Sequence, residues 1–125
     1  MLEQALLEAN DELMVERLAE FLRRNRPSLV DILGAVCEVY KVDPDEIQTG
    51  KHIHAPARHA FCYLARRWSG EPDCDIGPYV GLNALMVMRA FKNFHLNLDN
   101  PLVRDDLDLI GVKIAERVLL HRRMR

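Results

Sequence analysis

Hydrophobic residues recur every three or four positions along most of this 125-residue chain, and polar residues fill the positions between them. This spacing places the hydrophobic side chains on one face of an α-helix. No run alternates hydrophobic and polar residues as a half-buried strand does. The last segment is the clearest case, because its predicted inward positions follow at intervals of three or four: Val103, Leu107, Ile110, Ile114, Val118 and His121. The pattern therefore predicts an all-α fold.

Capping residues and prolines divide the chain into separate helices. Polar N-cap side chains accept hydrogen bonds from the first free backbone amides, and proline fits the first helical turn. The predicted starts lie, in chain order, at Ser28, Asp43, Pro56, Asp73, Asn83 and Asn100. Gly50 and Gly70 are predicted stops, and Gly81 is the predicted sharp turn before Asn83. These boundaries predict a compact domain of several helices.

An acidic amphipathic helix is predicted over residues 2–24. Its acids come early and Arg23 and Arg24 come last, an order that suits the helix dipole. Because Pro27 ends this helix, we divide the chain into an N-terminal helix, residues 1–26, and a multi-helix domain, residues 27–125. The apolar stripe of the first helix must be covered, so we expect it to pack on the domain or to pair with a second copy.

Composition narrows the class of protein. Hydrophobic residues make up 49% of the chain and charged residues 29%, which is the balance of a folded domain. No run of about eighteen hydrophobic residues occurs, and the start lacks the pattern of an export signal. We therefore expect a cytoplasmic protein with no membrane partner.

The cysteines and histidines indicate neither a disulfide framework nor a metal site. Cys37, Cys62 and Cys74 are odd in number and form no C-x-x-C pair, so we expect reduced thiols in or near the core. His52 and His54 with Cys62 or Cys74 match no structural zinc spacing, and they lie in a basic stretch. No local Ser-His-Asp or Cys-His arrangement is present. We expect no metal, no cofactor and no enzymatic activity.

A net charge of −2 conceals an uneven distribution of charge along the chain. Residues 1–50 hold eleven acids and five bases, whereas residues 51–125 hold twelve bases, eight acids and all five histidines. Residues 51–67 contain no acid, and their basic side chains are Lys51, His52, His54, Arg58, His59, Arg66 and Arg67. Such a stretch favours a polyanionic partner. For Arg66 and Arg67, a solvated helix face is the alternative interpretation.

Two short helices joined by Gly81 have the dimensions of a helix-turn-helix. The first covers residues 73–80, and the second begins near Asn83 and ends near residue 96. In DNA-binding proteins of this kind the second helix enters the major groove. Helical hairpins with a glycine turn also occur in proteins that bind no DNA, so this spacing alone leaves both functions open.

The order of these features over about residues 27–120 resembles the C-terminal DNA-binding domain of DnaA, the bacterial chromosomal replication initiator. The matching stretches are Val42-Asp43-Pro44-Asp45-Glu46-Ile47, then Ala57-Arg58-His59-Ala60-Phe61-Cys62-Tyr63-Leu64-Ala65-Arg66-Arg67, then Asp75-Ile76-Gly77-Pro78-Tyr79-Val80-Gly81. In that family a short helix precedes a basic loop, an arginine-bearing helix follows, and a Pro-Glu-Ile-Gly-type helix leads into the recognition helix. The resemblance implies a Trp-repressor-like helix-turn-helix and double-stranded DNA as the partner.

The chain departs from that family at the positions that read DNA bases. The family signature Gly-Gly-Arg-Asp-His-Thr-Thr-Val is replaced by the shorter Gly81-Leu82-Asn83-Ala84-Leu85-Met86-Val87, and Pro56 stands where the family has a minor-groove arginine. Each lost bidentate base contact removes ~1–3 kcal/mol of discrimination. The chain also contains no phosphate-binding loop motif, so we expect no nucleotide and no ATPase activity. The sequence predicts binding mainly to phosphates, with weak sequence specificity.

Two sets of candidate DNA-binding residues follow. The predicted phosphate contacts are Lys51, His54, Arg58, Arg66 and Arg67, and the predicted groove contacts are Asn83, Met86 and Arg89. Leu82, Leu85 and Met86 can also be additional core or a protein interface, and we rank these two interpretations first. We predict an accessory or regulatory DNA-binding module. The alternative is a protein-interaction module that has kept the fold and lost DNA binding, with residues 2–24 or these three apolar residues as its contacts.

Overall fold

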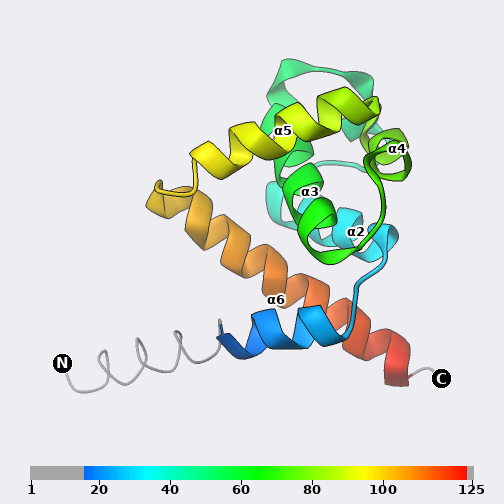
Figure 1. The fold of residues 1–125 in the computed structure, drawn as a ribbon, viewed down its shortest axis with the longest axis vertical. Helices are drawn as coiled ribbons and strands as arrows, with labels where there is room; N and C mark the ends of the chain where they lie inside the picture. The colour runs from blue at the N-terminus through cyan, green and yellow to red at the C-terminus, as the bar shows by residue number, and fades with distance from the viewer. Residues whose placement is uncertain (1–15, 124–125) are drawn as a thin grey trace.

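The computed structural model describes residues 16–123, and every regular element in that range is helical (Figure 1). A helix over residues 16–24 comes first. The α-helices after it are α2 (Leu29–Tyr40), α3 (Ala55–Trp68), α4 (Asp73–Ile76), α5 (Ala84–Leu96) and α6 (Pro101–Arg123). Three short 3₁₀ helices connect them, namely η1 (Glu46–Thr49), η2 (His52–His54) and η3 (Gly77–Val80). The predicted all-α fold is confirmed. Residues 2–15 of the predicted first helix lie outside the described range.

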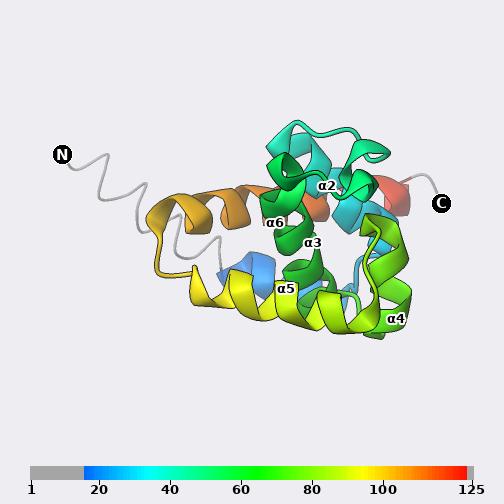
Figure 2. The ribbon, with the colours of Figure 1, turned by 90° about the horizontal axis from the view of Figure 1, so that it is seen from above.

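Helix α3 occupies the centre of the fold. It packs against α2 and α5, and α2 in turn packs against α6. Figures 1 and 2 show α5 and α6 diverging from the turn that joins them, with α3 held between the remaining helices. Phe61 of α3 is fully buried, and it shares one hydrophobic core with Ile32 of α2 and Ile110 of α6. The helical spacing seen in the sequence therefore corresponds to faces that meet in a single core.

Three of the six predicted helix starts are confirmed by their capping bonds. The hydroxyl oxygen of Ser28 accepts from the Asp31 amide at 3.1 Å, Asn83 Oδ1 accepts from the Met86 amide at 2.9 Å, and Asn100 Oδ1 accepts from the Leu102 amide at 3.0 Å. Asp73 is an exception: Pro72 occupies the N-cap position of α4, and the Asp73 carboxylate instead pairs with Arg66. A nearby basic side chain competes successfully with the free amides for this carboxylate.

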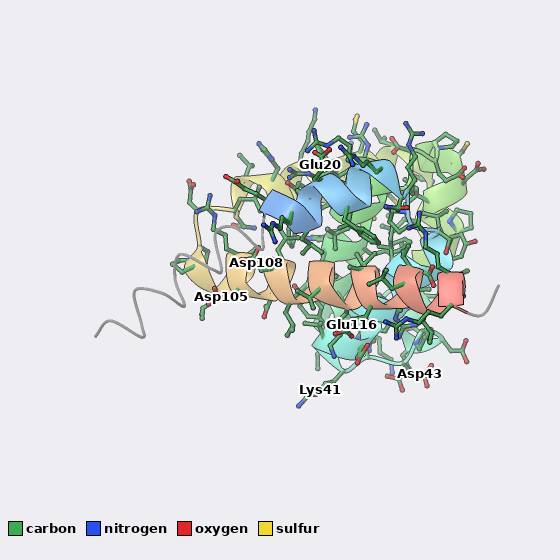
Figure 3. The ribbon with its side chains drawn as sticks, turned by 90° about the horizontal axis from the view of Figure 1, so that it is seen from below. Glu20, Lys41, Asp43, Asp105, Asp108 and Glu116 are labelled. Carbon is green, nitrogen blue, oxygen red and sulfur yellow. The ribbon has the colours of Figure 1, made fainter. Side chains whose placement is uncertain are left out.

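The helix over residues 16–24 lies beside α6, as seen from below in Figure 3. Leu22 is only 2% exposed and belongs to the same core as Ile110 and Ile114. Gly111 of α6 lets the two helices approach, because a Cβ atom there would lie 3.0 Å from Leu18 Cδ2. The described end of the predicted N-terminal helix thus packs on the domain, which is one of the two arrangements expected for it.

The C-terminal part of α6 is joined to the start of α2 by a side-chain pair. His121 Nε2 lies 2.9 Å from Oδ1 of Asp31, a carboxylate that is almost fully buried. A buried carboxylate needs such a partner, so this contact helps to fix α6 against α2. None of the helices described within residues 16–123 is long and apolar enough to cross a membrane.

Candidate nucleic-acid interface

Two glycines build the turn between η3 and α5. Gly81 has φ +70°, in the left-handed region that favours glycine, which confirms the predicted sharp turn. A Cβ atom on Gly81 would lie 2.6 Å from the Gln48 carbonyl oxygen, and one on Gly77 would lie 2.1 Å from the Leu82 carbonyl oxygen. Neither position has room for a side chain. The turn is therefore compact, and it holds η3 against η1, which leads into the basic loop.

The first turn of α5 presents a free face. Val87 is fully buried and anchors the helix, whereas Leu85 is 51% exposed and Met86 is 46% exposed. Arg89, one turn further along, is also exposed. Leu82 is partly buried against the core. The core interpretation is thus right for Leu82 and wrong for Leu85 and Met86, whose side chains remain available to a partner.

Asn83, a predicted groove contact, is exposed but already has a structural role. Its Oδ1 accepts the hydrogen bond from the Met86 amide that caps α5. Its side-chain NH₂ group is a donor, and adenine N7 is an acceptor in the major groove. Asn83 can therefore offer only its donor half to a base while the cap is intact.

The basic loop before α3 places Lys51 and His54 differently. Lys51 is exposed in the segment that precedes η2. The His54 side chain is only 12% exposed, and its Nε2 lies 3.7 Å from a Glu46 carboxylate oxygen. Lys51 is thus a free charge for a phosphate, whereas His54 has an acidic neighbour and little accessible surface.

The position of Arg58 differs from its predicted role as a phosphate contact. The residue is 7% exposed, and its guanidinium donates to the Lys51 carbonyl at 2.9 Å and to the Ile47 carbonyl at 3.4 Å. The guanidinium therefore points into the fold and ties the basic loop to α3, which leaves it unsuited to a DNA phosphate in this conformation. The helical spacing contained this signal, because Arg58 precedes the buried Phe61 by three positions and Ala65 by seven.

Arg66 and Arg67 lie at the opposite end of α3 from Lys51. A helix of fourteen residues is about 20 Å long, so α3 separates the two groups. Arg66 pairs with Asp73 at 2.9 Å, and its guanidinium carbon lies 4.7 Å from the centre of the Phe91 ring. Arg67 instead donates to the Tyr63 hydroxyl at 2.8 Å and lies over Trp68. The acid-free window of the sequence is therefore not one continuous basic surface.

Burial also disfavours the charged form of a histidine and of the cysteine thiols in and near α3. Desolvation, with a smaller effect of the Arg58 charge, lowers the pKa of His59, so this histidine is less readily protonated than a free imidazole. Burial raises the pKa of the Cys62 thiol to about 12, and Cys37 is buried as well. The expectation of thiols in the core holds for these two cysteines, whereas Cys74 is exposed. Within residues 16–123, no three potential metal ligands come together.

Two arginines outside the predicted site lie close to Arg67. Arg23 and Arg26 line a cavity with it, although they come from the helix over residues 16–24 and the linker that follows it. A contact between residues so far apart in sequence leaves no local pattern. The run Arg23-Arg24-Asn25-Arg26 was the only sequence signal that this part of the chain is basic.

Comparison with known proteins identifies no relative: no protein-family model matches the chain, and no curated protein matches it significantly.

Proposed function

We propose that this protein is a DNA-binding module that places the first turn of α5 in the major groove and binds mainly through phosphates. The observation that carries the proposal is the combination of a compact glycine turn with a following helix that is anchored by Val87 and exposed at Leu85, Met86 and Arg89. A recognition helix needs this arrangement, because its inner face must be fixed while its N-terminal residues reach base edges.

The charges around α5 support this orientation. Arg89 and Lys92 are exposed on α5, and Lys51 is exposed on the loop that follows η1. Asp105, Asp108 and Glu116 are distributed along α6 (Figure 3), and α6 diverges from the first turn of α5 (Figure 1). Helix α6 also carries basic residues, but α5 contains no acid, so DNA phosphates at α5 would meet Arg89 and Lys92 without an acid on the same helix. The resemblance to the DnaA domain favours the same helix as the one that contacts DNA.

The residues present at the start of α5 limit its specificity. Leu85 and Met86 offer no strong hydrogen-bonding group to base edges, and they are suited to apolar contacts such as that with a thymine methyl group. The donor half of Asn83 is the main polar group left in this turn. We therefore propose sequence-tolerant binding by an accessory or regulatory protein that carries out no catalysis of its own.

A protein-interaction module is the second candidate function, and exposed apolar side chains favour it. Leu85 and Met86 are about half exposed, and Ile53 in the basic loop is 79% exposed. Exposed apolar side chains of this kind are common in protein interfaces. Under this alternative, the same surface would bind a protein and duplex DNA would show no affinity.

Charge reversal on α5 separates the two candidates. Fluorescence anisotropy with a labelled duplex should show binding by the full chain, and Arg89→Glu should weaken it at least about tenfold, through loss of one phosphate contact and added repulsion. Arg104→Glu on α6 is the matched control, since Arg104 is also exposed but lies on the other helix, and it should retain the affinity. Equal effects of both substitutions would show that α5 is not the contact surface. Absence of binding by the unmodified chain would favour the interaction module.

A further inference from the structure

A cavity of about 340 Å³ lies between the helix over residues 16–24 and the end of α3. Its lining consists of Ala19, Arg23, Arg26, Arg67, Trp68 and Gly70. Three of these six residues are arginines and none is an acid. Like charges repel each other, so an anion bound in this hollow would reduce the repulsion among the three arginines.

Arg67 lines this cavity and is oriented by two neighbouring aromatic residues. Its Nη1 donates to the Tyr63 hydroxyl at 2.8 Å, and its guanidinium carbon lies 5.0 Å from the centre of the Trp68 ring. A guanidinium carries five N–H donors, so most of them remain for a ligand. No carboxylate among residues 16–123 lies within ion-pair distance of Arg67. The side chain is thus oriented in advance and keeps its charge available.

Arg26 belongs to the same lining and lies close to Gly70. A Cβ atom on Gly70 would lie 2.6 Å from Arg26 Nη1, so a side chain there would displace the guanidinium. Gly70 also has φ +75°, which disfavours other residues. Within the described chain, Arg26 has no carboxylate partner either.

Arg23 is the third arginine of the cluster, and its present ion pair can be exchanged for another. It pairs with Glu20 at 3.0 Å, but its side chain is 68% exposed, and exposed ion pairs of this kind are weak. A multiply charged anion can therefore compete with Glu20 for the guanidinium of Arg23. Arg24, its neighbour in the sequence, also pairs with Glu20 but does not line the cavity.

We propose that Arg23, Arg26 and Arg67 form a binding site for a diphosphate group, supplied by inorganic pyrophosphate or by the phosphate chain of a nucleotide. Arginine binds phosphate oxygens through two parallel hydrogen bonds, and three guanidinium groups match a ligand with several negative charges better than a single phosphate. The volume suits a small ligand. The site shares Arg67 with the predicted DNA-phosphate contacts, but it uses none of the residues on α5, the helix that carries the proposed function.

Isothermal titration calorimetry of the full chain tests this site, with pyrophosphate and magnesium-free ADP as the two probes. Pyrophosphate should bind with a Kd below about 1 mM, and Arg26→Gln and Arg67→Gln should each weaken it at least about tenfold. Arg24→Gln is the matched control and should leave the Kd unchanged. If Arg67→Gln lowers the melting temperature, Arg67→Lys replaces it, since lysine keeps the charge but loses the planar fork.

The two probes also identify the source of the diphosphate. Tighter binding of ADP than of pyrophosphate would assign the site to nucleotides, and the reverse would assign it to the inorganic anion. The proposal is overturned if neither probe gives heat at millimolar concentration. It is also overturned if Arg24→Gln weakens binding as much as Arg26→Gln does, because that result indicates diffuse attraction to a basic surface.

Discussion

At the scale of single residues, Arg58 links the basic loop to the core. Its guanidinium joins the carbonyl of Ile47, in η1, to that of Lys51, just before η2. Carbonyl oxygens that accept from a charged donor form stronger hydrogen bonds than neutral pairs do. Arg58 therefore affects the loop indirectly, by fixing the backbone that carries Lys51.

Replacement of Arg58 by methionine should cost about 2–4 kcal/mol of unfolding free energy. The substitution leaves two carbonyls without their charged donor, and each such bond contributes roughly 1.5–3 kcal/mol. It should also raise the pKa of His59 towards its ordinary value, because the Arg58 charge is one cause of the lowered pKa. Urea unfolding and NMR titration of His59 measure the two effects. Arg89→Met, an exposed control on α5, should change neither, and an equally small effect of Arg58→Met would contradict the buried role.

Local chemistry explains which residues were assigned correctly from the sequence. Ser28, Asn83 and Asn100 cap helices through bonds to amides two or three positions away, so a short stretch of sequence is sufficient to recognise them. Asp73 differs from its predicted capping role because its partner, Arg66, comes from another helix. The cluster of Arg23, Arg26 and Arg67 has no sequence pattern for the same reason, since only the tertiary fold brings these residues together.

At the scale of elements, the helix over residues 16–24 belongs to the domain. Leu22 enters the core that α2, α3 and α6 share, and Leu18 packs at Gly111. Pro27 follows the end of this helix, and the helix before it still packs against the core formed by the residues after it.

We expect Leu22→Ala to destabilise the protein by about 2–5 kcal/mol, the usual cost of truncating a buried leucine. Leu102→Ala is the control, because Leu102 is 73% exposed on α6 and should change stability by less than about 0.5 kcal/mol. Thermal or urea unfolding of the full chain gives both values. Indistinguishable effects would mean that this helix does not pack on α6 in solution.

At the scale of the whole molecule, the basic residues do not form one surface. Lys51 lies at the start of α3, Arg67 lies at its end, and Arg66 is paired with Asp73. Thus only some of the basic side chains that were predicted to contact DNA phosphates lie near α5 without an acidic partner among the described residues. The sequence alone shows that basic residues exceed acids in residues 51–125. How these basic residues are distributed over separate surfaces depends on the fold.

The number of phosphates contacted can be measured from salt dependence. If about three basic side chains meet phosphates, the logarithm of the DNA-binding constant should fall against the logarithm of salt concentration with a slope near −3. Anisotropy titrations at several salt concentrations give this slope, and Lys51→Ala should reduce its magnitude by about one. A slope near zero would exclude phosphate contacts as the source of affinity.

The most direct test of the proposed function compares a duplex carrying the DnaA recognition box with a scrambled duplex, by competition anisotropy at one moderate salt concentration. We expect both to bind and the box to be preferred by less than about tenfold, or ~1.4 kcal/mol, because the start of α5 lacks the polar groups that read bases. A hundredfold preference would contradict sequence-tolerant binding and reveal a readout by Asn83, Met86 and Arg89. No binding to either duplex would contradict DNA binding itself.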